Sequence, residues 1–299
     1  MEPTIVTGIM DIGRGRLEGN PWARPFSYYR TGLIKLMARP HPMIIYIQRR
    51  DENLVYSHRR HSPTEIVIVE PEHLASQFPY YDMLQGILHS ETWLRQTPRM
   101  RSSLQYLLDE YLPLNMMKSY WLKEAAVKNP FNTTAHLWID GGIYGNPRFP
   151  QLGGFSTTRV FDTPFFTLCC MPCIVRNEMH GFARNAMKRY AGVSRVYFRA
   201  LGGILGGPSE CVVQVVDLYD DMLHRTLKEG HLGTEENIFT ILMHRFPDLF
   251  TAYHPVLKRI VLNQKWVARE SRALGLLEAL GVMRAYRRFA PILNNYDQT

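Results

Sequence analysis

The sequence predicts an α/β fold: a doubly wound, mostly parallel sheet with helices on both faces and a helical C-terminal region. Short apolar runs rich in β-branched residues alternate with stretches of helical spacing, a pattern typical of parallel sheets built from βαβ units. Two of these runs are followed by acidic residues, Asp11 and Asp140. Because ligands bind beyond the carboxyl ends of the strands in such sheets, we expect a site there.

The first half of the chain supplies most of the predicted parallel strands. Each is a short apolar run, and they lie at 4–10, 42–48, 64–70 and 135–140. The stretch 26–38, "FSYYRTGLIKLMA", has helical spacing and stops before an Arg-Pro pair, where a helix is not expected to continue. Residues 72–128 are predicted to be mostly helical.

The second half has a different pattern. We predict strand material at 158–172, a helix at 181–192, and a helix beginning the stretch 234–250. The stretch 195–230 is predicted as a strand, a double-glycine turn and a long helix. A basic, amphipathic helical region is expected at 264–290.

The composition limits the classes of function. The chain has 299 residues and a formal net charge of +8, which suits an anionic partner such as a nucleotide, a nucleic acid or a membrane surface. No RRM, KH or zinc-finger pattern is visible, so nucleic acid is not the expected partner. The four cysteines lack the spacing of a zinc site and are expected to be reduced thiols. Without a signal-peptide pattern or a long apolar run, we expect a soluble, cytoplasmic protein.

The stretch "HLWIDGGIYG" places Asp140 at the end of an apolar strand. A carboxylate there has to be hydrogen-bonded, exposed to solvent or bound to a cation, because burying it unpaired is costly. Gly141 and Gly142 would let a ligand approach the backbone closely. The alternative is an ordinary Asp-Gly turn.

Two later stretches could also contribute to a site. In "ALGGILGGPSE", two glycine pairs precede a helix, which suits close approach of a ligand, an anion at the helix N-terminus, or simply a packed turn. In "HLGTEENIF", Thr234 can cap a helix. Glu235 and Glu236 would then favour the positive end of the helix dipole, or one of them could act as a general base.

Basic residues follow the first strand and recur before the fourth. Guanidinium groups suit a diphosphate, although a solvated basic loop has the same composition; the arginines of this loop and the helix after it are Arg14, Arg16, Arg24 and Arg30. Lys118 lies in a helical stretch that leads to the Asp140 strand. His254 precedes a proline, and it is relevant to a site only if Asp140 requires a second residue beside it to bind a ligand.

Together these motifs resemble the HtrL/YibB family, a bacterial family whose members are similar to GT-A nucleotide-sugar transferases. The resemblance covers most of 4–253. In chain order, it is carried by "TIVTGIMDIGRG", "SYYRTGLIKLM", "MIIYI", "NPFNTTAHLWIDGGI", "LGGILGGPSE" and "GTEENIFTILMHRFPDLF". The resemblance implies a GT-A-like domain at 1–260, with a nucleotide-sugar-binding half at 1–145 and an acceptor-side half at 146–260. Residues 261–299 would form a helical extension packed on it.

The resemblance also implies roles for individual residues on the donor side. Thr7, Gly8 and Asp11 would line the base and ribose of the nucleotide, Arg14 would contact the diphosphate, and Lys118 would lie on the nucleotide side. Asp140 would hold the place of the D-x-D motif of GT-A enzymes, and the second carboxylate of that motif is missing here.

A single carboxylate supplies few of the ligands of Mn²⁺ or Mg²⁺, because these ions bind several oxygen atoms. We expect Asp140 to hold the metal, with His254 as a second ligand. The diphosphate and waters could instead supply the other ligands, or arginines could replace the metal.

On the acceptor side, the resemblance implies that Gly141, Gly142, Gly203 and Gly206 lie near the sugar and acceptor. Glu236, or failing that Glu235, would take the proton from the acceptor hydroxyl in an inverting transfer. In a retaining transfer the same acid would stabilise the oxocarbenium-like centre or form a covalent intermediate.

The expected function is therefore transfer of a sugar from a nucleotide-diphosphate donor, by default a UDP-sugar, to a glycan or glycoprotein hydroxyl in surface-glycan synthesis. The alternatives are an inactive nucleotide-sugar-binding protein and, more remotely, a basic nucleic-acid-binding protein. The basic segment 264–299 could also contact an anionic membrane peripherally.

Overall fold

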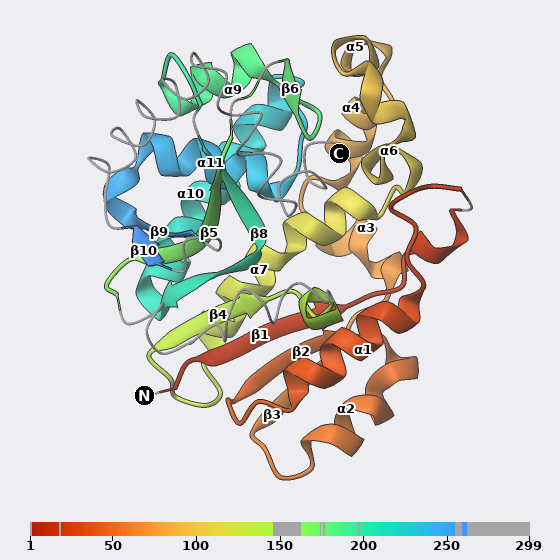
Figure 1. The fold of residues 1–299 in the computed structure, drawn as a ribbon, viewed down its shortest axis with the longest axis vertical. Helices are drawn as coiled ribbons and strands as arrows, with labels where there is room; N and C mark the ends of the chain where they lie inside the picture. Colours follow the sequence, from red (N-terminus) through yellow and green to blue (C-terminus); the bar gives the residue numbers. More distant parts are fainter. Residues whose placement is uncertain are drawn as a thin grey trace.

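The structure is a computed structural model that describes residues 2–17, 19–145, 163–173, 175, 177–196, 198–254 and 259–261. These residues form an eight-stranded sheet with the strand order β10-β9-β5-β8-β4-β1-β2-β3 and a two-stranded ribbon, β6-β7. In Figure 1, β1, β2 and β3 lie with α1 and α2 towards one end of the molecule, and α9, α10 and α11 group towards the other.

The first four strands are parallel neighbours, as their sequences predict. They are β1 (Thr4–Ile9), β2 (Met43–Ile47), β3 (Thr64–Ile68) and β4 (Ala135–Ile139). The strand β1 pairs in parallel with both β2 and β4, and β2 pairs in parallel with β3. Every residue of β2 is buried, because this strand lies between β1 and β3 and is covered on both faces.

The two faces of the sheet support separate hydrophobic cores. Ile45 and Ile47 pack in the core that includes α1 (Phe26–Met37) and Val55 of α2 (Glu52–Arg59). Ile44 and Tyr46, which alternate with them, pack in the core that includes α7 (Tyr111–Lys128). This alternation places α1 and α7 on opposite faces, which is the doubly wound arrangement.

Between β3 and α7 the chain is helical, as predicted for 72–128. The short helices are η3 (Pro71–His73), α3 (Leu74–Gln77), α4 (Tyr81–Leu88), α5 (Glu91–Gln96), η4 (Pro98–Ser102) and α6 (Leu104–Leu107). Two further 3₁₀ turns, η1 (Arg14–Arg16) and η2 (Arg49–Asp51), follow β1 and β2. Another, η5 (Ile143–Gly145), follows β4.

The second half of the sheet is mixed. Its strands are β5 (Phe166–Pro172), β8 (Phe198–Pro208), β9 (Phe250–His254) and β10 (Arg259–Val261). The strand β8 is antiparallel to β4 and β5, and β10 is antiparallel to β9, whereas β9 is parallel to β5. The carboxyl ends of β1, β4, β5 and β9 therefore lie at one edge of the sheet.

The remaining elements of this half are the ribbon strands β6 (Glu178–Met179) and β7 (Phe182–Ala183), the helices α9 (Arg184–Ala191), α10 (Ser209–Lys228) and α11 (Glu235–Arg245), and η7 (Pro247–Leu249). The helix α10 packs against α7, and α11 packs against α9 and β8. Its position against β8 brings the beginning of α11 to the edge of the sheet where Asp140 lies.

The predicted double-glycine turn is wrong. The strand β8 runs without a break through both glycine pairs to Pro208. The glycines are needed for close contact rather than for turning. A Cβ on Gly206 would lie 2.2 Å from the carbonyl oxygen of His136 in β4, and one on Gly207 would lie 2.7 Å from that of Phe165. The glycine pairs were interpreted as a turn, but they allow neighbouring strands to pack closely.

The predicted α/β class, with a doubly wound sheet and flanking helices, is confirmed. The domain boundaries stay a prediction. The basic region 264–290, residues 158–162 of a predicted strand and the side chain of His254 lie outside the described parts. Within the described residues, no helix combines the length and the apolar character needed to cross a membrane.

Candidate functional site

Three elements meet at a buried ion cluster, which we call the Lys118 cluster: Lys118, Asp140 and Glu235. Lys118 comes from α7, Asp140 follows β4, and Glu235 opens α11. The Nζ of Lys118 lies 3.0 Å from Oδ1 of Asp140 and 3.1 Å from Oε1 of Glu235. Lys118 and Glu235 are 117 residues apart in the chain, so only the tertiary fold brings them together.

Asp140 is the exposed member of the cluster. Its side chain is 35% exposed, against 10% for Lys118 and 5% for Glu235. Its Oδ1 accepts a hydrogen bond of 2.7 Å from Nε1 of Trp138, and its backbone N–H donates to the carbonyl of Gly203 at 2.9 Å. These bonds fix a carboxylate that solvent and a ligand can reach, as a strand-end site requires.

Glu235 and Glu236 are adjacent but face different partners. Helix α11 is anchored by a capping box in which the N–H of Thr234 donates to Oδ1 of Asn237 at 2.7 Å. Glu235 then contacts Lys118, whereas Oε1 of Glu236 accepts a 3.0 Å hydrogen bond from the N–H of Gly202. In the helix, successive side chains diverge by about 100°.

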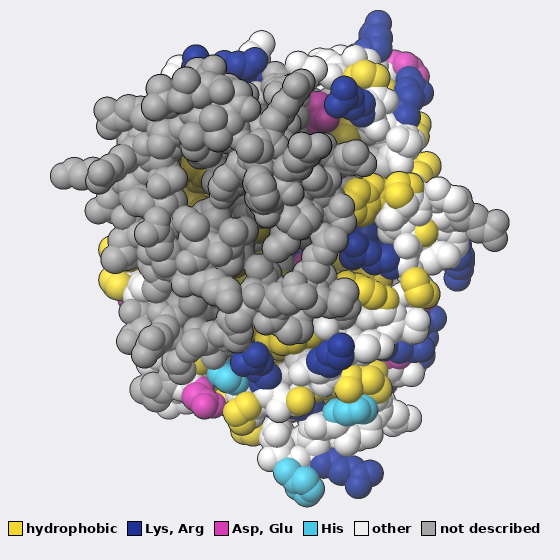
Figure 2. Space-filling view, viewed as in Figure 1, with side chains coloured by type: hydrophobic (Ala, Val, Ile, Leu, Met, Phe, Trp, Pro, Cys, Tyr) yellow, Lys and Arg dark blue, Asp and Glu magenta, His cyan; other side chains and the backbone are white. Residues whose placement is uncertain are grey.

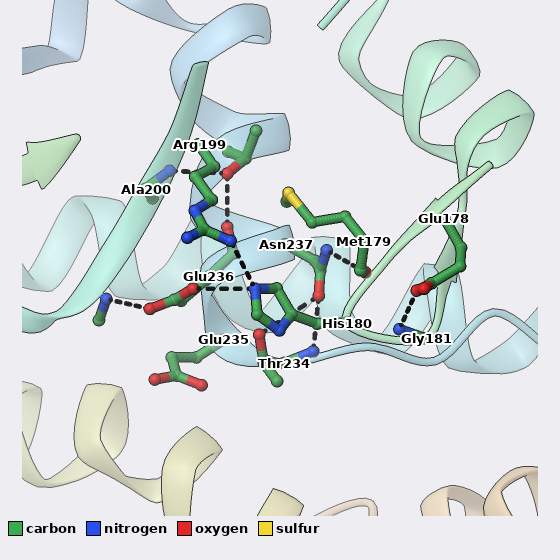
Figure 3. A network of polar contacts seen from close by, with 12 residues as sticks. Glu178, Met179, His180, Gly181, Arg199, Ala200, Thr234, Glu235, Glu236 and Asn237 are labelled. Atoms are coloured by element: carbon green, nitrogen blue, oxygen red, sulfur yellow. Dashed lines mark hydrogen bonds and ion pairs between the residues drawn. The ribbon is translucent and has the colours of Figure 1, made fainter. Parts of the chain in front are cut away.

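A second polar network holds Glu236 in place. Its Oε2 lies 3.4 Å from Nε2 of His180, and the same ring nitrogen lies 3.1 Å from NH1 of Arg199. His180 has a left-handed backbone, with φ of 50°, beside Gly181. In Figure 3, Glu236 lies within this network, and Glu235 lies at its edge. Glu236 is thus held by β8 and His180, whereas Glu235 faces Lys118.

Burial changes the acid–base behaviour of the cluster. Burial raises the pKa of Glu235 to about 7, against the opposing pull of Lys118, and the neighbouring charges of Glu236 and Asp140 add to the rise. Burial also opposes the charge of Lys118, but Asp140 and Glu235 outweigh it and raise the lysine pKa above its usual value. A buried carboxyl that titrates near neutral pH, beside a fixed cation, is suited to proton transfer.

Glycines of β8 make room for the cluster. The register of β8 against β5 shifts between the pairs Leu168–Leu205 and Cys169–Leu201, so residues 202–204 bulge there. A Cβ on Gly202 would lie 2.2 Å from Oε1 of Glu235. Gly203, predicted to lie near the sugar, lies next to Asp140: a Cβ there would be 3.6 Å from Oδ2.

Gly141 and Gly142 are packed against the protein itself. A Cβ on Gly141 would meet Ile9 at 2.5 Å, and one on Gly142 would meet the ring of Tyr29 at 2.7 Å. The space that these glycines leave is therefore filled by β1 and α1. Of the predicted acceptor-side glycines, Gly203 is the one beside the Lys118 cluster, since Gly206 packs on β4.

The arginine-rich loop after β1 lies beside the same edge. Arg14 donates to the hydroxyl of Tyr29 and to the carbonyl of Trp22, and Arg24 lies over the ring of Tyr28. Figure 2 shows Lys and Arg side chains interleaved with hydrophobic ones over the region of α1 and its preceding loop. Burial raises the pKa of Tyr111 to about 12; the charges of Arg14 and Lys118 oppose this rise, and that of Glu235 adds to it.

Asp11 is held in its own network. Arg50 donates to its Oδ2 at 2.8 Å, and Gly13 donates to its Oδ1 at 3.1 Å. Burial opposes ionisation of Asp11, but the hydrogen bond from Arg50 and the other donors outweigh it and hold its pKa below the usual value. Asp11 is therefore a fixed carboxylate at the end of β1, suited to accept from hydroxyl groups.

Thr7 and Gly8, expected to line the nucleotide, have structural contacts. The buried hydroxyl of Thr7 donates to the carbonyl of Ile139 at 2.6 Å, which ties β1 to β4. A Cβ on Gly8 would lie 2.7 Å from the carbonyl of Tyr46. The described atoms of both residues thus contribute to sheet packing.

The described residues do not fit the expected divalent metal. Among them no group of three or more His, Cys, Asp or Glu side chains is placed to hold an ion. The position next to Asp140 is taken by the ammonium of Lys118. His254 ends β9, which is separated from β4 by β5 and β8. A contribution of its side chain to a metal stays a prediction.

Sequence reasoning missed several residues of the site: Trp138, Tyr29, Tyr111, Gly202 and His180. A signal existed for Trp138, because residues i and i+2 of a strand share a face and Trp138 precedes Asp140 by two. Gly202 also had a signal, because it directly precedes Gly203 in one of the two glycine pairs of "ALGGILGGPSE". Tyr29, Tyr111 and His180 come from segments far from Asp140 in the chain, and no local spacing connects them.

Residues 1–258 match the sequence profile of a family described as "Bacterial protein of unknown function (HtrL_YibB)". The chain belongs to the HtrL/YibB family. It is similar to Protein HtrL of Escherichia coli (strain K12), with 22% identity over 254 residues that cover 83% of this chain and 86% of that protein. The predicted resemblance is therefore confirmed at the level of the family.

This HtrL/YibB protein is distantly similar to the following solved structures. Mouse xyloside xylosyltransferase 1 in its apo form has 11% identity, covers 84% of each chain and has a TM-score of 0.37. A CMP:2-keto-3-deoxy-manno-octonic acid synthetase complexed with CTP has 12% identity, a TM-score of 0.36, and covers 93% of this chain and all of its own. At these scores the likeness carries no conclusion about function.

Proposed function

We propose that this HtrL/YibB protein transfers a sugar from a nucleotide-diphosphate donor, by default a UDP-sugar, to a glycan hydroxyl in surface-glycan synthesis. The observation that carries the proposal is the Lys118 cluster, in which a buried carboxyl with a pKa of about 7 lies beside a lysine and a reachable aspartate. The resemblance to GT-A transferases in the motifs that build this cluster supports the same reading.

The cluster suits the proton transfer of an inverting reaction. Ionised Glu235 takes the proton from the acceptor hydroxyl as its oxygen attacks the anomeric carbon of the donor. The bond between that carbon and the diphosphate oxygen breaks, and its electron pair leaves with the diphosphate. We assign Lys118, which contacts Glu235 directly, and Arg14 to stabilising this negative charge as it develops, which is the effect of fixed cations at such a position.

Glu235 is a better candidate for the base than Glu236. Glu235 contacts Lys118 and has the raised pKa. Glu236 is engaged by Gly202 and by the His180 network. We therefore assign the base to Glu235 and an orienting role to Glu236. The anomeric configuration of the product distinguishes an inverting from a retaining transfer.

A screen of nucleotide sugars tests the proposal. Purified protein is incubated with each donor, with and without Mn²⁺, and release of the nucleoside diphosphate is measured. We expect hydrolysis of at least one donor, lost in Glu235→Gln and in Asp140→Asn. The matched control is Asp217→Asn, an exposed acid on α10 paired with Lys123. Binding of a donor without hydrolysis or transfer would favour the inactive binding protein, and no binding of any donor refutes the proposal.

A further inference from the structure

The place beside Asp140 that a metal would need is already taken by a protein side chain. The Nζ of Lys118 lies 3.0 Å and 3.3 Å from the two oxygens of the Asp140 carboxylate. It also lies 3.1 Å from Glu235. One ammonium thus faces two carboxylates from two other elements, and this is the contact pattern expected of a bound cation.

Lys118 cannot easily leave this position. It lies within the 18-residue helix α7, on the face that packs into the core with Met117 and Trp121. Its side chain is only 10% exposed. Moving the ammonium away would leave Glu235 buried beside Asp140 without a counter-charge, which is costly. The lysine is therefore part of the resting structure of the site.

A divalent ion at Asp140 would conflict with this arrangement. Mg²⁺ binds carboxylate oxygens at about 2.0–2.1 Å, and Ca²⁺ at about 2.3–2.6 Å. An ion bound to either oxygen of Asp140 would then lie within a few ångströms of the ammonium, in a partly buried setting where like charges repel strongly. Only one cation, the ammonium of Lys118 or a metal ion, can occupy the position beside Asp140, and in this fold it is the ammonium.

We infer that Lys118 is the permanent cation of this site and makes it independent of divalent metal. An ammonium has three N–H donors, and the two carboxylates take up two of them. The described residues offer Lys118 no further acceptor. The remaining donor is available to an anionic oxygen of the ligand. The donation to a ligand oxygen rests on the proposed function, in which that oxygen belongs to the leaving diphosphate. The exclusion of a divalent metal by Lys118 does not depend on the proposed function.

Manganese binding to the full chain tests the exclusion without any donor. Mn²⁺ is titrated into the protein, and the free ion is followed by electron paramagnetic resonance. Wild type is expected to bind no stoichiometric Mn²⁺ at micromolar protein. Lys118→Ala leaves two carboxylates facing the vacated position, and it is expected to gain Mn²⁺ affinity at least tenfold. Lys118→Ala combined with Asp140→Asn is expected to lose that gain.

Two outcomes would overturn the inference. One is tight Mn²⁺ binding by wild type that Asp140→Asn abolishes. The other is a folded Lys118→Ala protein that gains no Mn²⁺ affinity. Circular dichroism establishes that the variants are folded. If the alanine variant does not fold, the titrations of wild type and Asp140→Asn decide the inference by themselves, because Mn²⁺ binding by wild type that depends on Asp140 contradicts it.

The donor experiment separates the two proposals. Donor binding and hydrolysis by wild type are expected to change less than twofold after treatment with a chelator, and Lys118→Met is expected to weaken both at least tenfold. Hydrolysis that disappears with the chelator and returns with Mn²⁺ would overturn the inference while the proposed function stands. If no nucleotide sugar binds, the proposed function fails, and the manganese titration still decides whether Lys118 excludes the metal.

Discussion

Two buried cations in this protein, Arg59 and Lys118, are satisfied in different ways. Arg59 donates to the backbone carbonyls of four residues, Met37, Arg39, His41 and Pro63, and to the hydroxyl of Thr64. These neutral acceptors join the end of α1, the loop before β2 and the start of β3. Lys118 instead faces two carboxylates, one of which is open to solvent.

The difference indicates that Arg59 stabilises the fold and that Lys118 belongs to the reactive site. A guanidinium surrounded by main-chain carbonyls holds the chain in place and has no ionisable partner. An ammonium between two acids links a group that titrates near neutral pH to a surface that a ligand can reach. Burial alone therefore does not indicate function, whereas the chemical nature of the partners does.

The largest effect is expected in the acid of the Lys118 cluster. Glu235→Gln keeps the shape of the side chain and removes the base, so the rate of donor hydrolysis or transfer should fall by about 10²–10⁴-fold. The measurement is nucleoside diphosphate release at a saturating donor concentration. The adjacent variant Glu236→Gln should retain more activity than Glu235→Gln, because Glu236 acts through Gly202 and His180. A smaller loss in Glu235→Gln than in Glu236→Gln would reverse the assignment.

Substitution of Arg59 should lower the stability of the protein rather than its activity. Arg59→Met removes the donors of several buried carbonyls, and the free energy of unfolding should fall by about 3 kcal/mol. Urea denaturation measures this change, and Arg60→Met, its exposed neighbour, is the control. The activity per folded molecule should stay near that of wild type. An Arg59→Met protein with normal stability and no activity would contradict the structural role of Arg59.

The pH dependence sharpens the account of Glu235. The base is active when ionised, so kcat/KM should rise with pH through an apparent pKa of about 7. At a pH between the unfolded pKa of Glu235 and about 7, the folded state keeps a proton on Glu235 that the unfolded state has released. The contribution of Glu235 to stability is thus present below the unfolded pKa and declines as pH rises through about 7. Unfolding of Glu235→Gln should lack this decline, and an unchanged pH profile of stability in that variant would contradict the assignment.

A small effect is expected from the glycine beside the cluster. A methyl group on Gly202 would displace the carboxylate of Glu235, so Gly202→Ala should lower activity about tenfold, the magnitude of roughly 1.4 kcal/mol in the barrier. The control is Gly86→Ala in helix α4, where a Cβ meets nothing within 4 Å. That variant should keep full activity and gain about 0.5–1 kcal/mol of stability. Equal activity in both variants would show that the position of Glu235 is not critical.

The sequence predicted the parallel strands well because each is a short apolar run with polar flanks. It failed at β8, since glycines that permit close strand contact look the same as glycines that make a turn. The choice between Glu235 and Glu236 depends on how α11 rotates against β8, which local spacing does not specify. The pairing of Lys118 with Glu235 depends on the tertiary fold, because 117 residues separate them.

The most direct test of the central claim compares wild type, Glu235→Gln and Arg59→Met at equal concentrations of folded protein on a panel of nucleotide sugars. The account predicts that wild type hydrolyses at least one donor, that Arg59→Met does so at a similar rate, and that Glu235→Gln is slower by about 100-fold or more. Full activity of folded Glu235→Gln, or no binding and no hydrolysis of any donor by wild type, would contradict it.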